Sequence, residues 1–305
     1  MQELIHRIPK LGLGTVQMGM DYGITNTDGK IPPERACEII NIAMQNDIEI
    51  LDTAHAYGNS EDVLGECLGK KKDKIVKIIT KTPISLKRIS EEDMSAYIKN
   101  ALNKSLKRIG RESIYGYLVH HAKDLLSDRG ESIWQEMLRL RDAGLVRKIG
   151  FSAYTAEEID AVLDKLQPDL VQLPMNALDR RLMQTGTIFR LRDAGVEVHA
   201  RSLFLQGILL QPPQWFRGFF APLARPVSIL DETSRALGIT RMALLLGLVW
   251  QMGMADYLIV GVTNKHQLME LLQAREQAIS MPAVNLPDEA YKINEQLLNP
   301  TQWPK

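Results

Sequence analysis

The chain has 305 residues, of which 45% are hydrophobic and 24% are charged, and its 37 basic residues equal its 37 acidic residues in number. This composition is typical of a soluble globular protein with a large core, and it excludes a disordered chain. A formal net charge of zero provides no field that would attract nucleic acid or an anionic membrane. The short basic run at 69–74 is interpreted as a solvated loop.

The compartment is inferred from three features of the sequence. The first ten residues contain no apolar segment of the kind found in secretory leaders, so a cytoplasmic location is expected. The only cysteines, Cys37 and Cys67, fall in segments with helical periodicity, and a reducing environment is the default for such a chain. The longest apolar run, residues 242–250, is about half as long as a membrane span requires and is expected to be a buried helix.

Short runs rich in β-branched residues alternate with longer amphipathic segments along the chain. The short runs predict eight strands, at residues 10–15, 48–53, 75–80, 114–120, 146–152, 170–174, 196–201 and 257–262. The segments between them carry helix signals, such as the Ser90 cap and Gly110 at the two ends of one segment. Another segment has the capping-box spacing of Thr155 and Glu158.

Alternation of strands and helices favours parallel pairing through right-handed crossovers. Eight such units close into a barrel, so we predict an α/β fold, a (β/α)8 TIM barrel, as a single domain over residues 1–305. A doubly wound sheet is the alternative. The glycines at 11–19 lack the G-x-G-x-x-G spacing which that fold favours, and no helix is expected directly after them.

Two loops are candidates for the mouth of a ligand site. Residues 203–226 separate the seventh strand from its helix and are rich in aromatic residues and proline, which is typical of a lid or binding segment, although a surface loop is also possible. Residues 21–30 follow the first strand and either line the substrate mouth through Tyr22 or form an ordinary turn.

Four titratable residues fall at or just after the ends of consecutive predicted strands: Asp52, Tyr57, Lys81 and His120. Taken separately, each has an ordinary interpretation as a cap, a solvated lysine or a core histidine. In a barrel, however, these positions meet at the rim that carries catalytic groups, so their convergence favours an active site.

The four residue types together suit the reduction of a carbonyl group. A nearby Lys81 ammonium is expected to lower the pKa of the Tyr57 phenol, and Asp52 would keep the buried ammonium charged. Tyr57 could then protonate a carbonyl oxygen that His120 orients by a hydrogen bond. No side chain donates hydride, so a nicotinamide cofactor is implied.

The segments DTAHAYGNSE, ITK, YLVHH, GFSAY, VQLPMN and GVTNKHQLMELL, in this order, resemble the aldo-keto reductases. The resemblance implies a (β/α)8 barrel that binds NADPH in an extended pose and reduces aldehydes or ketones. It makes Tyr57 the general acid, Lys81 and Asp52 its tuning pair, and His120 the orienting donor. His121 is set aside because consecutive strand side chains point to opposite faces.

The resemblance also implies a set of cofactor-binding residues: Gly14, Thr15, Asp52, Ser152, Gln172, Arg201, Ser202, Gln206, Gly207, Lys265, Gln267 and Glu270. The chain departs from the family pattern at Ala153, where asparagine is usual, and at Arg201, where an aromatic ring often stacks on the nicotinamide. The Lys-Ser pair that grips the 2′-phosphate is replaced by Gly261 and Val262, with Lys265 as a possible substitute. NADPH is expected and NADH is possible.

Other functions remain as alternatives. A class I aldolase would use Lys81 as a neutral Schiff-base amine, and the same barrel could serve as a non-catalytic, nucleotide-sensing partner of another protein. A metal-dependent hydrolase is disfavoured because the chain has six histidines and no H-x-H motif, so no metal is expected. The small-molecule carbonyl substrate is expected to be sugar-derived, because residues 13–24 and 200–210 resemble a bacterial branch associated with carbohydrate metabolism.

Overall fold

The computed structural model describes residues 10–69, 76–84 and 86–304. Eight parallel strands form a closed barrel in chain order, with β8 pairing β1: β1 Lys10–Gly14, β2 Ile50–Asp52, β3 Lys77–Lys81, β4 Ile114–Val119, β5 Val146–Ser152, β6 Leu170–Pro174, β7 Glu197–Arg201 and β8 Tyr257–Gly261. The predicted (β/α)8 barrel is confirmed. The extent of a single domain over the whole chain stays a prediction.

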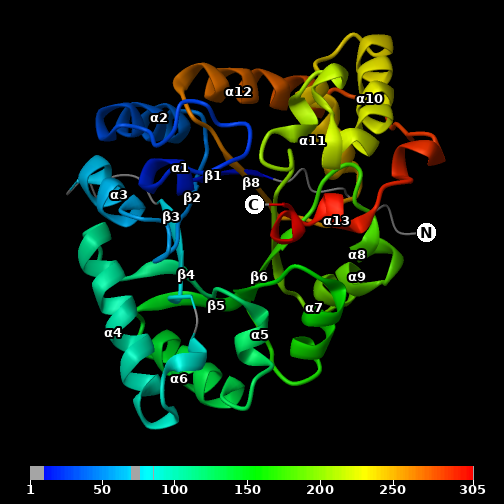
Figure 1. Ribbon diagram of the computed structural model, residues 1–305. Helices are drawn as coiled ribbons and strands as arrows, with labels where there is room; N and C mark the ends of the chain where they lie inside the picture. Colours follow the sequence, from blue (N-terminus) through cyan, green and yellow to red (C-terminus); the bar gives the residue numbers. More distant parts are fainter. Residues whose placement is uncertain (1–9, 70–75, 85, 305) are drawn as a thin grey trace.

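Helices surround the strands (Figure 1). Their bounds are α1 Val16–Gly19, α2 Pro33–Gln45, α3 Ser60–Leu68, α4 Glu91–Ile109, α5 Ala122–Leu125, α6 Gly130–Asp142, α7 Ala156–Leu163, α8 Arg181–Gln184, α9 Thr187–Asp193, α10 Ala224–Ala236, α11 Arg241–Gln251, α12 Lys265–Ile279 and α13 Glu295–Leu298. The expected caps are present: Ser90 accepts from Asp93 N, Thr155 accepts from Glu158 N, and Gly110 ends α4 at a φ of 69°. The apolar run at 242–250 forms most of α11, where most side chains are buried.

Two local predictions differ from the structure, and a third concerns residues that lie mostly outside the described part of the chain. The expectation that no helix follows the first strand was wrong, because the one-turn helix α1 begins two residues after β1. The 203–226 segment is not an open loop: it contains the 3-10 helices η2 Ile208–Leu210, η3 Pro213–Trp215 and η4 Gly218–Leu223, and it ends in α10. Most of the basic run at 69–74 lies outside the described residues.

The interior of the barrel is filled by a separate apolar cluster: Ile50, Ile79, Leu118, Leu170, Tyr257 and Ile259. Glycines opposite the large side chains make room for them, since a Cβ on Gly12 would lie 2.5 Å from Ile259 Cδ1. The outward-facing residues of the strands pack under the helices in the main core. The barrel is therefore a packed core and leaves no pore.

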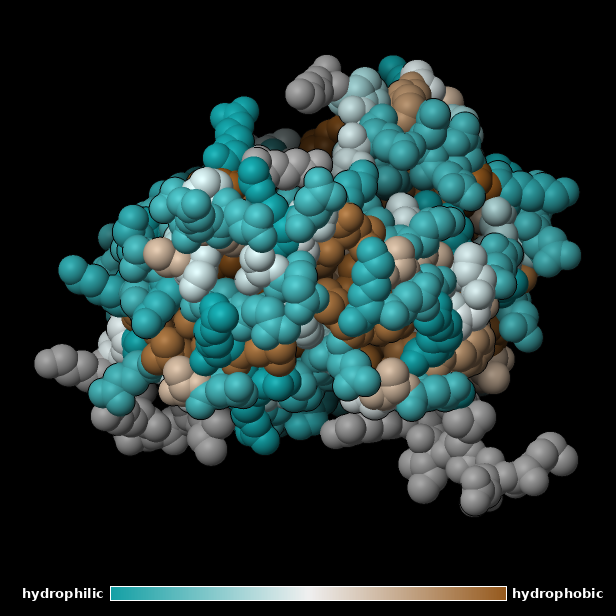
Figure 2. Space-filling view, turned by 90° about the horizontal axis from the view of Figure 1, so that it is seen from below, coloured by the Kyte–Doolittle hydropathy of each residue, from teal (hydrophilic) through white to brown (hydrophobic). Residues whose placement is uncertain are grey.

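Hydrophilic side chains cover most of the face shown in Figure 2, with hydrophobic ones showing between them. Among the described residues, no helix is both long and apolar enough to cross a membrane. Three of the exposed large hydrophobic residues, Met20, Tyr22 and Ile24, lie close together in the chain, in the segment that follows α1. That segment forms part of the cavity described below.

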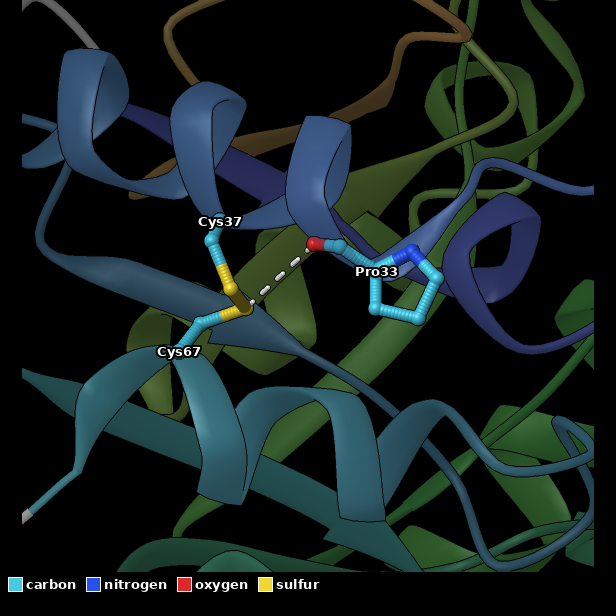
Figure 3. The surroundings of a disulfide bond; sticks show 3 residues. All are labelled: Pro33, Cys37 and Cys67. Carbon is cyan, nitrogen blue, oxygen red and sulfur yellow. Dashed lines mark hydrogen bonds between the residues drawn. A yellow bond between two sulfur atoms is a disulfide. The ribbon is translucent and has the colours of Figure 1, made fainter.

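The two cysteines form a disulfide that joins α2 to α3 (Figure 3). Cys37 and Cys67 are both half-buried, and their Cα atoms are 4.8 Å apart. Disulfides persist mainly in oxidising compartments, so this pairing differs from what the expected reducing environment would favour. It ties together the two helices that flank β2 in the sequence.

Reduction of this disulfide is expected to destabilise the protein. Because 30 residues separate the cysteines, the loop-entropy model predicts a loss of about 3–4 kcal/mol in the free energy of unfolding. Urea unfolding with and without dithiothreitol measures this loss. The Cys37→Ser/Cys67→Ser double variant is the control, because its stability should not respond to dithiothreitol. Equal stability of the unsubstituted protein under both conditions would contradict the prediction.

Candidate active site

A cavity of about 610 Å³ opens at the carboxyl ends of the strands, within the range typical of small-molecule sites. Its lining includes every predicted site residue except Lys265. Ile259 belongs both to this lining and to the apolar cluster inside the barrel. The packed barrel interior therefore forms part of the floor of the cavity.

A buried ion pair lies in the cavity wall. Lys81 Nζ is 2.9 Å from both carboxylate oxygens of Asp52 and donates a third hydrogen bond of 2.9 Å to Thr53 O. Gln172 Nε2 donates to Asp52 Oδ1 at 2.8 Å. Lys81 is 1% exposed and Asp52 is 4% exposed. Burial lowers the pKa of Lys81, and the contacts with Asp52 oppose that shift.

Neighbouring elements hold Asp52 by its backbone. Thr15, directly after β1, donates from both its backbone N and its hydroxyl to Asp52 O, at 3.0 and 2.9 Å. The same hydroxyl lies 2.7 Å from Ser60 Oγ at the start of α3, and Ser60 Oγ also donates to Thr15 O at 2.9 Å. The Thr15 hydroxyl, predicted to contact a cofactor, is therefore already engaged in fixing the end of β2.

Tyr57 lies in the loop between β2 and α3, beside the ion pair. Lys81 Nζ is 5.1 Å from the centroid of the Tyr57 ring. Burial raises the pKa of Tyr57 and the charge of Asp52 raises it further, while Arg201 opposes the shift. The expectation that Lys81 would lower this pKa is not met, because the ammonium is paired with Asp52 and the phenol is desolvated. The phenol is thus protonated at neutral pH.

His120 follows β4 and faces Tyr57 edge-on, with the ring centroids 6.0 Å apart. Burial, assisted by the charge of Lys81, lowers the pKa of His120 to about 3, so the imidazole is neutral at physiological pH. Its Nδ1 is buried and has no hydrogen-bond partner in the part of the chain that the structure describes. Its backbone N donates to Thr82 Oγ1 at 3.1 Å, which fixes the chain where the strand ends.

The structure corrects the argument that was used to set His121 aside. The two histidine rings lie side by side, with centroids 5.0 Å apart and planes inclined by 36°. The alternation of strand side chains does not reach them because β4 ends at Val119. His121 nevertheless does not line the cavity, whereas His120 does.

Arg201 ends β7 and projects its guanidinium into the cavity lining. Its Cζ lies 4.2 Å from the centroid of the Tyr154 ring. Nη2 donates to Ala153 O at 3.1 Å and Nη1 donates to Ser202 Oγ at 3.3 Å. Ser152 is buried in the same wall.

The two candidate mouth loops meet each other. Ile24 N donates to Gln206 Oε1 at 3.1 Å, and Thr25 Oγ1 donates to Gln206 O at 2.7 Å. The contact requires an unusual backbone, since Leu205 and Gln206 have φ values of 45° and 54° and Gly207 has 87°. Tyr22 lines the cavity, so the interpretation of its loop as part of the mouth is supported.

The far end of the cavity lies at the start of α12. Gln267 and Glu270 line it; Gln267 Oε1 accepts from Thr263 N at 2.8 Å, and Gln267 N donates to the capping side chain of Asn264 at 3.0 Å. Lys265 is not part of this lining. It is 57% exposed at its side chain and pairs with Glu38 at 2.7 Å.

Sequence reasoning missed several lining residues, including Gln17 and Tyr154. Gln17 lies in α1, the helix that was not predicted, and its Oε1 is buried without a partner. Tyr154 was within the recognised segment GFSAY, but nothing in the sequence indicated that an arginine would stack on it. Within the described residues, no group of three His, Cys, Asp or Glu side chains is placed to hold a metal ion.

The charge state of His120 can be tested by titration. Its ring is expected to stay neutral from pH 8 down to about pH 4, because its pKa is lowered to about 3. Two-dimensional NMR of the imidazole protons measures this titration, and His120→Gln identifies the signal. Protonation of His120 near pH 6.5 would contradict the assigned environment.

Comparisons with known proteins identify the family of the chain. A model of the Aldo/keto reductase family matches residues 10–292. Aldo-keto reductase YhdN of Bacillus subtilis is 29% identical over 182 residues, which cover 58% of this chain and 53% of that protein. NADH-specific methylglyoxal reductase of Escherichia coli is 27% identical over 218 residues, which cover 66% of this chain and 65% of that protein.

The solved structures support the fold. The holo form of aldo-keto reductase AKR11C1 from Bacillus halodurans superposes with a TM-score of 0.72 at 21% identity, covering 95% of this chain and 90% of that chain. Because the family match extends over most of the chain and agrees with the closed barrel and its lined cavity, the chain belongs to the aldo/keto reductase family.

Proposed function

We propose that this protein reduces an aldehyde or ketone to an alcohol, with Tyr57 as the proton donor and a nicotinamide dinucleotide as the hydride donor. The observation that carries the proposal is the convergence of Tyr57, His120 and the buried Lys81–Asp52 pair on one cavity. Membership of the aldo/keto reductase family supports nicotinamide-dependent carbonyl reduction in general.

The cavity fits an extended dinucleotide. It runs from His120, after β4, to Glu270 in α12, which follows β8, and these strands lie on opposite sides of the closed barrel. Polar groups line its length: Gln17 Oε1 has no hydrogen-bond partner among the described residues, and Ser152 lies in the opposite wall. When bound, the dinucleotide supplies hydride to the carbonyl carbon.

The side chains of this protein donate the proton and orient the carbonyl oxygen that receives it. Tyr57 keeps its proton in the resting state because burial raises its pKa. It gives up that proton as negative charge develops on the carbonyl oxygen, which neutral His120 orients by a hydrogen bond. The Lys81–Asp52 pair fixes the wall beside the phenol, with the Lys81 cation 5.1 Å from the ring centre. Arg201 is the cation that lowers the pKa of Tyr57 and so favours the phenolate that remains.

The two alternative functions have less support. A Schiff-base lysine needs a free neutral amine, whereas Lys81 donates three hydrogen bonds and is 1% exposed. A nucleotide-sensing partner without catalysis would not need the phenol and the imidazole to share a cavity. Turnover of any carbonyl compound would exclude that second alternative.

We further propose NADH as the preferred cofactor, in place of the NADPH that the resemblance implied. A 2′-phosphate would need a cation at the adenosine end, and Lys265 is engaged outside the cavity with Glu38. Among the described lining residues, the only lysine and arginine are Lys81 and Arg201, both near Tyr57, while Glu270 is at the far end. A carboxylate there suits a ribose 2′-hydroxyl. One relative is named an NADH-specific methylglyoxal reductase.

Two finer expectations stay predictions. The substrate is proposed to be a sugar-derived carbonyl compound, on the resemblance of residues 13–24 and 200–210 to a carbohydrate-related branch. A cytoplasmic location is expected from the sequence, and the Cys37–Cys67 disulfide is the feature of this chain that would respond to the redox state of its compartment.

Replacement of the proton donor is expected to stop turnover without preventing cofactor binding. Tyr57→Phe should lower kcat for a simple aldehyde by roughly 10²- to 10⁴-fold, the usual contribution of a positioned acid, and should leave the dissociation constant of NADH nearly unchanged. Tyr22→Phe, which removes another phenol from the lining, is the matched control and should retain most activity. Activity of Tyr57→Phe at the level of the control would contradict the role of Tyr57.

Cofactor preference is tested by binding without turnover. NADH should bind at least about tenfold more tightly than NADPH, measured by quenching of protein fluorescence, because the phosphate adds close to two negative charges near Glu270. Gln267→Arg should strengthen NADPH binding selectively. Lys265→Ala is the control and should change the dissociation constant of neither NADH nor NADPH. Selective weakening of NADPH binding by Lys265→Ala would contradict the proposal and show that Lys265 contributes to NADPH binding.

A further inference from the structure

Among the residues that the structure describes, no carboxylate forms an ion pair with Arg201, a cation of the cavity lining. The described lining contains the carboxylates of Asp28, Asp52 and Glu270. Neither Asp28 nor Glu270 forms an ion pair with Arg201 within 4.0 Å. Asp52 is already bound through both oxygens to Lys81. In the part of the chain that the structure describes, the Arg201 guanidinium donates hydrogen bonds to two neutral oxygens, Ala153 O and Ser202 Oγ.

The guanidinium of Arg201 is held in place and still has N–H donors that make no hydrogen bond within the described residues. One of its faces lies on the Tyr154 ring, and the two hydrogen bonds to Ala153 O and Ser202 Oγ use one proton on each terminal nitrogen. A guanidinium carries five N–H donors, so three remain. The contact with Tyr154 and the two hydrogen bonds fix the guanidinium before a ligand arrives. This lowers the entropic cost of binding a planar or tetrahedral anion.

The end of the cavity near Tyr57 and Arg201 carries a net positive charge. Lys81 and Asp52 cancel each other, and His120 is neutral because its pKa is lowered to about 3. The Arg201 charge acts on Tyr22, Tyr57 and His120, so it lies within electrostatic reach of the phenol and of the mouth. One positive charge therefore remains beside the position that the carbonyl group would occupy.

We propose that Arg201 binds an anionic group of the substrate, a carboxylate or a phosphate, and so selects acidic carbonyl compounds such as oxo acids or phosphorylated aldehydes. This inference rests on the proposed function of the same cavity. Arg201 determines substrate specificity: it binds the anionic group through bidentate, charge-assisted hydrogen bonds, while Tyr57 donates the proton. A sugar acid or sugar phosphate belongs to this class.

The guanidinium could serve the dinucleotide in place of the substrate, by stacking on the nicotinamide as the resemblance implied or by pairing with the pyrophosphate. The two roles separate by measurement. A contact with the dinucleotide changes the binding of NADH and affects all substrates equally. A contact with the substrate changes only the preference for the acidic member of a matched pair.

The experiment compares 4-carboxybenzaldehyde with its neutral isostere 4-formylbenzamide, and glyceraldehyde 3-phosphate with glyceraldehyde. The unsubstituted protein should show a higher kcat/KM for the acidic member of at least one pair. Arg201→Met should lower that preference by roughly 10- to 100-fold, the range expected for a hydrogen-bonded charge pair, chiefly through KM. Arg201→Lys should restore part of it. Arg217→Met removes an exposed arginine outside the lining and should preserve the preference.

The outcomes are distinct. An equal kcat/KM for both members of each pair would overturn the role of Arg201 and leave carbonyl reduction intact. A weaker NADH affinity of Arg201→Met with an unchanged preference would overturn it in favour of a contact with the dinucleotide. No reduction of any of the four compounds, despite NADH binding, would overturn the proposed function itself.

Discussion

The site depends on one interaction, the buried ion pair between Lys81 and Asp52. Each ion would be costly to bury alone, and removal of one partner from such a pair typically costs about 3–5 kcal/mol. The pair is therefore fixed. Gln172, from β6, secures the carboxylate of Asp52, and Thr15, directly after β1, secures its backbone carbonyl. The ring of Tyr57 packs near this fixed cation, so the position of the proposed proton donor follows from the position of the pair.

The fold was predictable because its signals are local. Strand runs, caps such as Ser90 and Thr155, and the repeated strand–helix alternation identify the barrel, and each predicted strand end lies within two residues of the observed one. The convergence of Asp52, Lys81 and His120 followed from the same logic, since the carboxyl ends of barrel strands meet at one rim.

Features set by three-dimensional contacts were not predictable in this way. A single helical turn such as α1 has too little periodicity to be recognised. The raised pKa of Tyr57 comes from burial, which the sequence does not quantify, and the partner of Lys265 is Glu38, more than two hundred residues away in the chain. The Cys37–Cys67 bond likewise depends on how α2 and α3 lie side by side.

The order of strands in the barrel divides the cavity between two halves of the chain. Asp52, Lys81 and His120 come from the ends of three consecutive neighbours, β2, β3 and β4, whereas Arg201 and Glu270 belong to the part that follows β6. If the proposed roles hold, mutations in the later part can alter which molecules are accepted while leaving the proposed proton-transfer residues untouched. The architecture thus allows new ligand preferences to evolve by changes confined to one side of the molecule.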